Sequence, residues 1–347
     1  MWSPTDSGPG FAPVQMTRVG DQVVARGQYA ALDQIASWNG SAWTTLSRFP
    51  TPYLQLAAEF EGSYIVAASP TSSLYGAVPV SFSRWNGAGW ESFGAPLAGA
   101  FITDMIVWNG RLVICGNIPD PAMPNSSSRV LLWNGSAWEP LGLRMTNGSS
   151  LCIVYDLEAW QGDLFAAGSF TAADGQAIKY IARWNGTSWS SLGIELPTSA
   201  RRMWVYNGQL MSNAYFSDPA FADKFAAWDG NAWRPVMNRL SFGHYTQWDG
   251  DAHFDMAVFG GDLYIAHGLS LADGEPSRYL ARYRNALGDA NNDHATNFLD
   301  LVLVLGNYAR TGEPGSIPGD CNNDGAVNML DLNDVLSAYG QVCPPSP

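Results

Sequence analysis

Two stretches near the C-terminal end of the sequence carry oxygen-bearing side chains at the spacing of a calcium loop. Residues 288–300 read GDANNDHATNFLD, and residues 319–331 read GDCNNDGAVNMLD. A hard cation such as Ca²⁺ takes six or more oxygen ligands, which a tight loop delivers from side chains at positions 1, 3, 5 and 9, a backbone carbonyl at 7 and a carboxylate at 12. Both stretches meet this pattern, so we predict two bound calcium ions. The predicted ligands are Asp289, Asn291, Asp293, Ala295, Asn297 and Asp300 in the first loop, and Asp320, Asn322, Asp324, Ala326, Asn328 and Asp331 in the second.

The two loops differ at position 6, and both are followed by apolar residues. Position 6 makes a sharp turn that favours glycine, and Gly325 meets this need in the second loop. His294 stands there in the first loop, where a tolerated left-handed histidine is a better explanation than a pH-sensing group, so we expect a weaker site. Each loop runs into an apolar, helix-like stretch. Apolar residues at these junctions suit a protein interface, although burial between the helices explains some equally well; they are Phe298, Leu299, Met329 and Leu330.

The composition narrows the possible partners. The chain has 347 residues and a formal net charge of −13, with 18 Lys and Arg residues in total. Because phosphate binding needs clustered positive charge, we do not expect nucleic acid as a partner. No apolar run is long enough to span a membrane, and residues 1–6 lack the basic and apolar regions of a signal peptide. We therefore expect either a protein that is not exported or a mature secreted form.

Four cysteines allow three disulfide pairings. Two of them lie in the calcium segment and two in adjacent upstream repeats, which favours the pairs Cys115–Cys152 and Cys321–Cys343. Free buried thiols are the alternative, because cysteine often serves as a small core residue. Disulfides together with calcium loops favour an extracellular location.

Upstream of the loops, residues 14–285 repeat themselves. Trp-Asn-Gly or Trp-Asp-Gly recurs at intervals of 44 to 51 residues, each time with a second Trp five positions after the first. The pairs are Trp38/Trp43, Trp85/Trp90, Trp133/Trp138, Trp184/Trp189 and Trp228/Trp233. A second signature, a glycine before a short apolar run, lies about 20 to 30 residues ahead of each pair and occurs a sixth time without a pair, so it shows six units. The glycines are Gly20, Gly62, Gly110, Gly162, Gly208 and Gly261.

Each unit has the turn chemistry of two β-hairpins. Asn-Gly and Asp-Gly populate the left-handed conformations that a two-residue hairpin turn requires, and the flanking segments are rich in aromatic and β-branched residues. In unit four this predicts strands at 154–159, 163–168, 179–184 and 188–192. Four-stranded units at this period indicate a β-propeller, since one such sheet cannot bury its faces without neighbours. A parallel solenoid is the alternative, although its units are usually shorter.

The sixth unit is incomplete. After Tyr283 the chain enters the first calcium loop without a second Trp. Because an open sheet edge is an aggregation hazard, residues 1–6, which include Trp2, could supply the missing outer strand. A three-stranded last blade is the alternative.

Two family resemblances follow from these motifs. Residues 14–285 resemble the Trp-Asn-Gly repeat propellers, kelch-like in period, of secreted bacterial proteins. The tail resembles a type I dockerin, because its two loops lie 31 residues apart, end in Asp300 and Asp331 and have no entering helix. That resemblance implies that the loop-to-helix junctions grip a cohesin. We therefore predict a mostly β fold, with a six-bladed β-propeller over residues 1–287 and a small C-terminal α-helical dockerin-like calcium-binding domain over residues 288–347.

The expected function is assembly rather than catalysis. We expect a secreted, non-catalytic protein that docks onto a cohesin-like module or onto another copy of itself, forming an extracellular polymer. No catalytic residue is predicted, because the four His (244, 253, 267 and 294) lack metal-ligand spacing and nothing marks a carboxylate pair. The acids considered for such a pair are Asp174, Asp273, Glu195 and Asp218. Alternatives are a carbohydrate-binding propeller and a polysaccharide-degrading enzyme carried by a dockerin, although tryptophans at fixed repeat positions favour packing between blades.

Overall fold

The computed structural model describes most of the chain, with gaps between strands. The described residues are 12–19, 22–29, 32–38, 43–48, 53–69, 79–120, 122, 127–148, 150–193, 199–206, 208–214, 225–228, 230, 233–235, 240–242, 255–259, 262–266, 269–272, 275–276, 280–283, 288–290, 296–312, 317–321 and 325–340. The chain forms two compact units, residues 1–191 and 192–347. The predicted domain boundary after residue 287 falls inside the second unit and stays a prediction.

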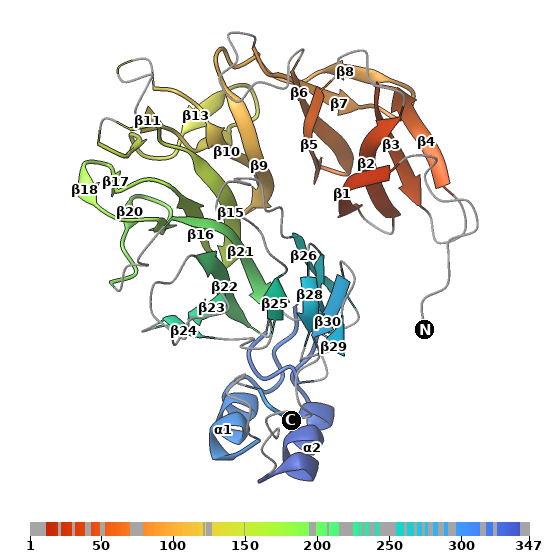
Figure 1. Ribbon diagram of the computed structural model, residues 1–347, viewed down its shortest axis with the longest axis vertical. Helices are drawn as coiled ribbons and strands as arrows, with labels where there is room; N and C mark the ends of the chain where they lie inside the picture. The colour runs from red at the N-terminus through yellow and green to blue at the C-terminus, as the bar shows by residue number, and fades with distance from the viewer. Residues whose placement is uncertain are drawn as a thin grey trace. The chain divides into compact units, whose positions relative to one another are not determined.

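Four antiparallel sheets of the first unit share one plan, in which four strands pair in the order of the sequence (Figure 1). The first sheet comprises β1 (Ala12–Val19), β2 (Gln22–Tyr29), β3 (Leu32–Trp38) and β4 (Trp43–Arg48). The second comprises β5 (Tyr53–Phe60), β6 (Ser63–Ser69), β7 (Ser81–Trp85) and β8 (Trp90–Ser92). The third comprises β9 (Phe101–Trp108), β10 (Arg111–Asn117), β12 (Leu131–Trp133) and β13 (Trp138–Pro140). The fourth comprises β15 (Val154–Trp160), β16 (Asp163–Gly168), β19 (Ile181–Trp184) and β20 (Trp189–Ser190), close to the strands predicted for unit four.

The second unit continues this plan. A further four-stranded sheet comprises β21 (Ala200–Tyr206), β22 (Gln209–Ala214), β23 (Phe225–Trp228) and β24 (Trp233–Pro235). A three-stranded sheet comprises β26 (Asp255–Phe259), β27 (Asp262–Ala266) and β30 (Leu280–Tyr283). Residues 1–6, which the sequence suggested as its fourth strand, lie outside the described residues.

Two smaller sheets are built from inserted strands. One joins β11 (Ser127–Ser128), β14 (Met145–Thr146), β17 (Ala172–Ala173) and β18 (Gln176–Ala177). The other joins β25 (Leu240–Phe242), β28 (Leu269–Ala272) and β29 (Glu275–Pro276). The hairpins β17–β18 and β28–β29 both interrupt a repeat between its second and third strands.

The two hairpins of a repeat use different turns. The first hairpin has a two-residue turn whose residues both have positive φ, as in Asn109 (49°) and Gly110 (70°), the combination of a type I′ turn. The Trp hairpin was also predicted to turn in two residues, and this is wrong, because Trp85 pairs with Trp90 across a four-residue loop. Of the first two residues of that loop, Asn86 and Gly87, only Gly87 has a positive φ. The Asn86 side chain accepts hydrogen bonds from two backbone N–H groups of the loop.

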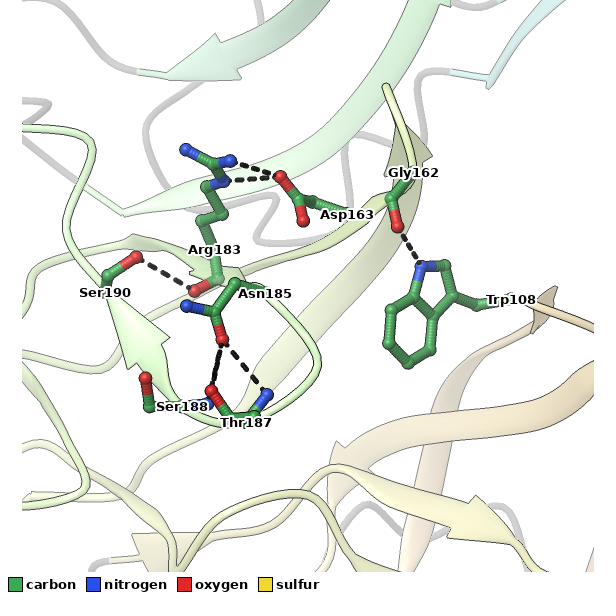
Figure 2. A network of polar contacts seen from close by, with 8 residues as sticks. All are labelled: Trp108, Gly162, Asp163, Arg183, Asn185, Thr187, Ser188 and Ser190. Atoms are coloured by element: carbon green, nitrogen blue, oxygen red, sulfur yellow. Dashed lines mark hydrogen bonds and ion pairs between the residues drawn. The ribbon is translucent and has the colours of Figure 1, made fainter.

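Repeat tryptophans pack in the cores between neighbouring sheets, as predicted. The two Trp rings of a repeat are in contact in a tilted or edge-on arrangement, with centroids 5.2 to 5.5 Å apart. One hydrophobic core joins the second sheet to the third, and another joins the third to the fourth. Indole groups also bond across sheets: Trp108 Nε1 donates to the Gly162 carbonyl at 3.0 Å (Figure 2), and Trp189 Nε1 donates to the Leu141 carbonyl at 2.9 Å. This packing of successive sheets is what a propeller requires.

Figure 2 shows how one outer hairpin is held. Asn185 Oδ1 accepts hydrogen bonds from the backbone N–H of Thr187 and of Ser188, at 3.0 and 3.1 Å. Beside it, Arg183 Nε donates to Asp163 Oδ2 at 2.6 Å, which links the third strand of the sheet to the second. The Trp-Asn-Gly motif is therefore a structural device in which Asn closes the turn.

Two helices follow the predicted calcium loops, as the sequence indicated: α1 (Phe298–Gly306) and α2 (Met329–Ala338). Both begin with a capping box, and they pack together over a small core that includes Val304, Val327 and Val335. Within the part of the chain that the structure describes, no helix has the length and apolar character needed to cross a membrane.

Candidate metal centre and docking surface

Two of the predicted ligands in each loop also cap the following helix. Asn297 Oδ1 accepts from the Leu299 N–H, and Asp300 Oδ2 accepts from the Asn297 N–H, both at 2.8 Å. Thirty-one residues later, Asn328 and Asp331 make the same two bonds, also at 2.8 Å. Loop positions 9 and 12 are thus the N-cap and third residue of a helix, so the helix fixes where these oxygens lie.

Reciprocal hydrogen bonds relate the two loop–helix units by a pseudo-twofold axis. The Ala309 N–H, after α1, donates to the Val327 carbonyl in the second loop at 2.7 Å. The Gly340 N–H, after α2, donates to the Thr296 carbonyl in the first loop, also at 2.7 Å. Each donor and each acceptor is 31 residues from its counterpart. Each loop is therefore held by a residue that follows the helix of the other loop–helix unit.

Glycines before the loops make equivalent close approaches. A Cβ added to Gly288 (φ +75°) would lie 2.6 Å from the Asp334 carbonyl oxygen of α2, and one added to Gly319 (φ +91°) would lie 2.9 Å from the Leu303 carbonyl oxygen of α1. Real Cβ atoms do not come this close to backbone, and the positive φ itself favours glycine. The two glycines let each loop pack directly on the opposite helix.

Four carboxylates are buried within the pair of loop–helix units. Asp289, Asp300, Asp320 and Asp331 are at most 1% exposed. Desolvation, and then the charges of Asp331, Asp334, Asp300 and Asp320, raise the pKa of the Cys321 thiol well above its usual range, so aspartates of both loops contribute to the negative potential at this sulfur. Desolvation and the Asp331 charge raise the pKa of Asp334 in the same way. So much buried negative charge is costly without a cation.

The donor set fits a hard cation. Asp320 Oδ2 accepts from the Gly325 N–H at 2.9 Å, a bond that closes the second loop. The Ala326 carbonyl also accepts from Asn328 Nδ2 at 3.1 Å, so it lies inside this loop beside a predicted ligand. Carboxylate, amide and carbonyl oxygens are the ligands that Ca²⁺ prefers.

The remaining predicted ligands lie outside the described residues. They are Asn291, Asp293 and Ala295 in the first loop, with His294, and Asn322 and Asp324 in the second. Among the residues that are described, no group of three His, Cys, Asp or Glu is arranged to hold a metal. Each loop has three carboxylates in its sequence, and in each the middle one is among the residues not described, so the two ion sites stay a prediction.

The predicted docking residues are exposed. Phe298, Leu299, Met329 and Leu330 are 63%, 60%, 61% and 57% exposed, which settles their placement against burial between the helices. Other apolar side chains extend this surface along both helices. We use the term apolar helix face for Phe298, Leu299, Val302, Leu305, Tyr308, Met329, Leu330, Leu336 and Tyr339. Tyr308 Oη lies 3.8 Å from Met329 Sδ, so the two halves of this face meet.

The three cysteines that the structure describes are free thiols. Cys115 and Cys152 share one buried core, but they do not form the favoured disulfide, which corresponds to the buried-thiol alternative. Burial raises the pKa of Cys152, to about 12, and outweighs the opposite effect of a hydrogen bond from the Ser128 backbone. Cys321 is also a thiol, and its predicted partner Cys343 lies outside the described residues. These thiols act as small core residues.

In the sheets, the residues considered for catalysis or sugar binding have other roles or are not described. Asp174 Oδ1 accepts from the Leu143 N–H at 2.7 Å, so this aspartate holds a turn. Asp273, Glu195, Asp218, His244, His253 and His267 lie outside the described residues. The buried repeat tryptophans, among them Trp184, Trp189 and Trp228, offer no surface for stacking on a sugar ring.

Sequence reasoning missed a carboxylate cluster on the first strands of the third and fourth sheets. Asp104 on β9 accepts through Oδ2 from the Leu157 N–H of β15 at 2.9 Å. Desolvation, then the charges of Asp156 and Asp104, raise the pKa of the half-buried Glu158 well above its ordinary value. The sequence signal was an acidic residue at alternate positions of β15, which places Asp156 and Glu158 on one face.

Comparisons with solved structures indicate a β-propeller-like fold. The β-propeller domain of the trilobed protease from Pyrococcus furiosus is 9% identical with a TM-score of 0.52, over 78% of this chain and 81% of that one. Acylaminoacyl peptidase from Pyrococcus horikoshii is 10% identical with a TM-score of 0.50, over 77% of this chain and 44% of that one. The chain thus spans less than half of that peptidase. At these identities the likeness shows the fold alone. The sequence matches no protein-family profile and no curated protein.

These neighbours correct the expectation that the chain is not an enzyme. Acylaminoacyl peptidase, an enzyme, shares the fold, so the fold gives no ground for excluding catalysis. The sequence argument relied on the lack of a marked carboxylate pair along the chain. It could not predict that packing of the third sheet against the fourth brings Asp104 close to Asp156 and Glu158 of the next repeat.

Proposed function

We propose that this protein is a secreted propeller that attaches to a protein partner through a calcium-stabilised, dockerin-like C-terminal domain. The observation that carries the proposal is the pseudo-twofold pair of loop–helix units, which buries four aspartates and leaves apolar residues exposed at the start of each helix. Six blades are part of the proposal. They are supported by five four-stranded sheets and one three-stranded sheet of the same plan among the described residues.

Calcium would act as a structural ion in this proposal. One ion per loop would be held by the aspartates at positions 1 and 12, with the side chains at positions 3, 5 and 9 and the carbonyl at 7 completing the shell. The ion supplies positive charge to carboxylates that are otherwise buried together. The chain's own contribution is the pair of capping boxes, which fixes the oxygens of Asp300 and Asp331 against their helices.

The partner that the surface fits best is a different protein with an apolar surface, such as a cohesin-like module. Nine of the eleven large hydrophobic residues that are exposed among the described residues belong to the apolar helix face. A second copy is disfavoured by charge, because each copy has a formal net charge of −13 and two copies repel at long range.

A retention experiment with the full chain tests the proposal. Immobilised protein should retain a partner from the secreted fraction of its source in calcium and release it in chelator. Phe298→Asp with Met329→Asp should abolish retention, whereas Leu143→Asp, on an exposed residue of the sheet region, should not. Retention that ignores both chelator and the paired substitutions would contradict the proposal. Light scattering that shows calcium-dependent dimers or polymers of the purified chain would assign the surface to a second copy instead.

A further inference from the structure

The turn between β21 and β22 differs from the equivalent turns of three other sheets. Gly62, Gly110 and Gly162 are exposed, and a Cβ added to any of them would meet nothing within 4 Å. Gly208, between β21 and β22, has the same φ as Gly110, +70°, and is buried. A Cβ added there would lie 2.5 Å from the Pro318 nitrogen and 2.7 Å from both its Cα and its Cδ. The turn that is open to solvent elsewhere is therefore covered here by the segment before the second loop.

We propose that Gly208 forms an intramolecular seat through which the helical pair is fixed to the β21–β24 sheet. The occupant is residues 317–319 of the same chain, and both partners belong to the compact unit 192–347. This inference concerns how the helical pair is held on the β21–β24 sheet, and it does not depend on which partner the apolar helix face binds.

The seat connects directly to the core of the helical pair. Ile317 is 5% exposed and belongs to the small core between α1 and α2. Pro318, the residue in contact, has a ring-restricted φ, and Gly319 then packs against the Leu303 carbonyl of α1. Three consecutive residues thus join the helical core, the sheet turn and α1. A rigid connection of this kind holds the apolar helix face at a fixed orientation to the sheet, instead of leaving it on a tether.

Glycine is the only residue that this seat accepts. Two of the three atoms nearest to the added Cβ, the nitrogen and Cα of Pro318, are backbone, so a side-chain rotation cannot relieve the overlap. An alanine at 208 must displace the segment. An alanine at 110 meets the same unfavourable φ but no neighbour, which makes Gly110→Ala a matched control for backbone strain.

Hydrogen exchange of the full chain in excess calcium tests the seat. In Gly208→Ala, amides of the segment 319–321 should exchange about tenfold faster than in the parent protein, while those of α1 and α2 keep their protection. Gly110→Ala should leave the segment 319–321 unchanged. Equal exchange of this segment in the two variants would overturn the proposal.

If Gly208→Ala disturbs the sheet itself, amides 209–214 will lose protection from exchange. A second variant then keeps the test decisive. Pro318→Ala keeps the backbone atoms of the seat and removes the ring, whose Cδ lies against Gly208. Amides 208–210 should then exchange about two- to fivefold faster in Pro318→Ala, because their cover is partly lost. No change in their exchange would overturn the proposal by this second route.

Discussion

The sheets and the helical pair both have an apolar core, but they differ in where their charged residues and their remaining apolar residues lie. In the sheets, apolar side chains such as Trp189 are buried between neighbours, and polar turns face water. In the helical pair, four aspartates are at most 1% exposed, whereas apolar residues such as Phe298 face solvent. The first distribution is stable by itself. The second leaves buried charge and exposed apolar surface, and on this we base the proposal of a bound cation and a protein partner.

Replacing one aromatic residue in each region gives the largest expected contrast. Trp189→Ala should lower the free energy of unfolding by about 3–5 kcal/mol, because it leaves a cavity and removes the bond to the Leu141 carbonyl. Phe298→Ala should change it by less than about 0.5 kcal/mol, because this ring is mostly in water. Denaturant unfolding measures both. A cost of several kcal/mol for Phe298→Ala would mean that this ring is part of the fold and not of a docking surface.

The close approach at Gly288 should be the most sensitive point of the helical pair. Gly288→Ala adds a Cβ 2.6 Å from the Asp334 carbonyl, and we expect it to destabilise the helices by about 2–4 kcal/mol. Gly340→Ala has a similar φ, +82°, with nothing within 4 Å, and should cost about 1–2 kcal/mol. Exchange protection of α2 reports both changes. Equal costs would show that backbone strain alone explains Gly288.

The half-buried carboxylate of Glu158 should reduce the stability of the sheets at pH values where it ionises in the unfolded chain. The folded state raises the pKa of Glu158 above its ordinary value of 4.5, so its contribution to stability is complete below that pH and is lost as pH rises through the folded pKa. Glu158→Gln should therefore raise Tm at pH 7 by about 2–4 °C, as about 1 kcal/mol does in a unit of this size. The gain should vanish near pH 4. Glu91→Gln, on an exposed residue of β8, should have no effect at either pH, and an equal gain there would refute the explanation.

The smallest expected effect compares the two N-caps. Asn297→Ala and Asn328→Ala each remove the bond to a helical N–H and should each cost about 1 kcal/mol. Serine at either position should restore most of the loss. At saturating calcium, where both loops should be filled, pseudo-twofold symmetry predicts similar values in circular dichroism melts. A twofold larger loss for one cap would show that the two halves are not equivalent.

Local rules allowed much of the fold to be predicted. The spacing of residues predicts the repeat period, the paired tryptophans and the helices after the loops, and the structure confirms these features. The Trp-Asn-Gly turn was misjudged because Asn can close a longer loop through its side chain, as Asn86 does, without a left-handed backbone. Contacts between residues far apart in the sequence could not be predicted. Nothing in the sequence distinguishes Gly208 from Gly110, and nothing marks Asp104 as a neighbour of Glu158, because both differences arise from packing between distant segments.

The most direct test of the central claim is hydrogen exchange of α1 and α2 in the full chain, titrated with calcium after treatment with chelator. We predict that both helices lose protection in chelator and recover it as two equivalents of calcium bind, while the sheet strands β9 and β10 stay protected throughout. The loop with His294 should be the last to fill. Helix protection that is the same in chelator and in calcium would contradict the account.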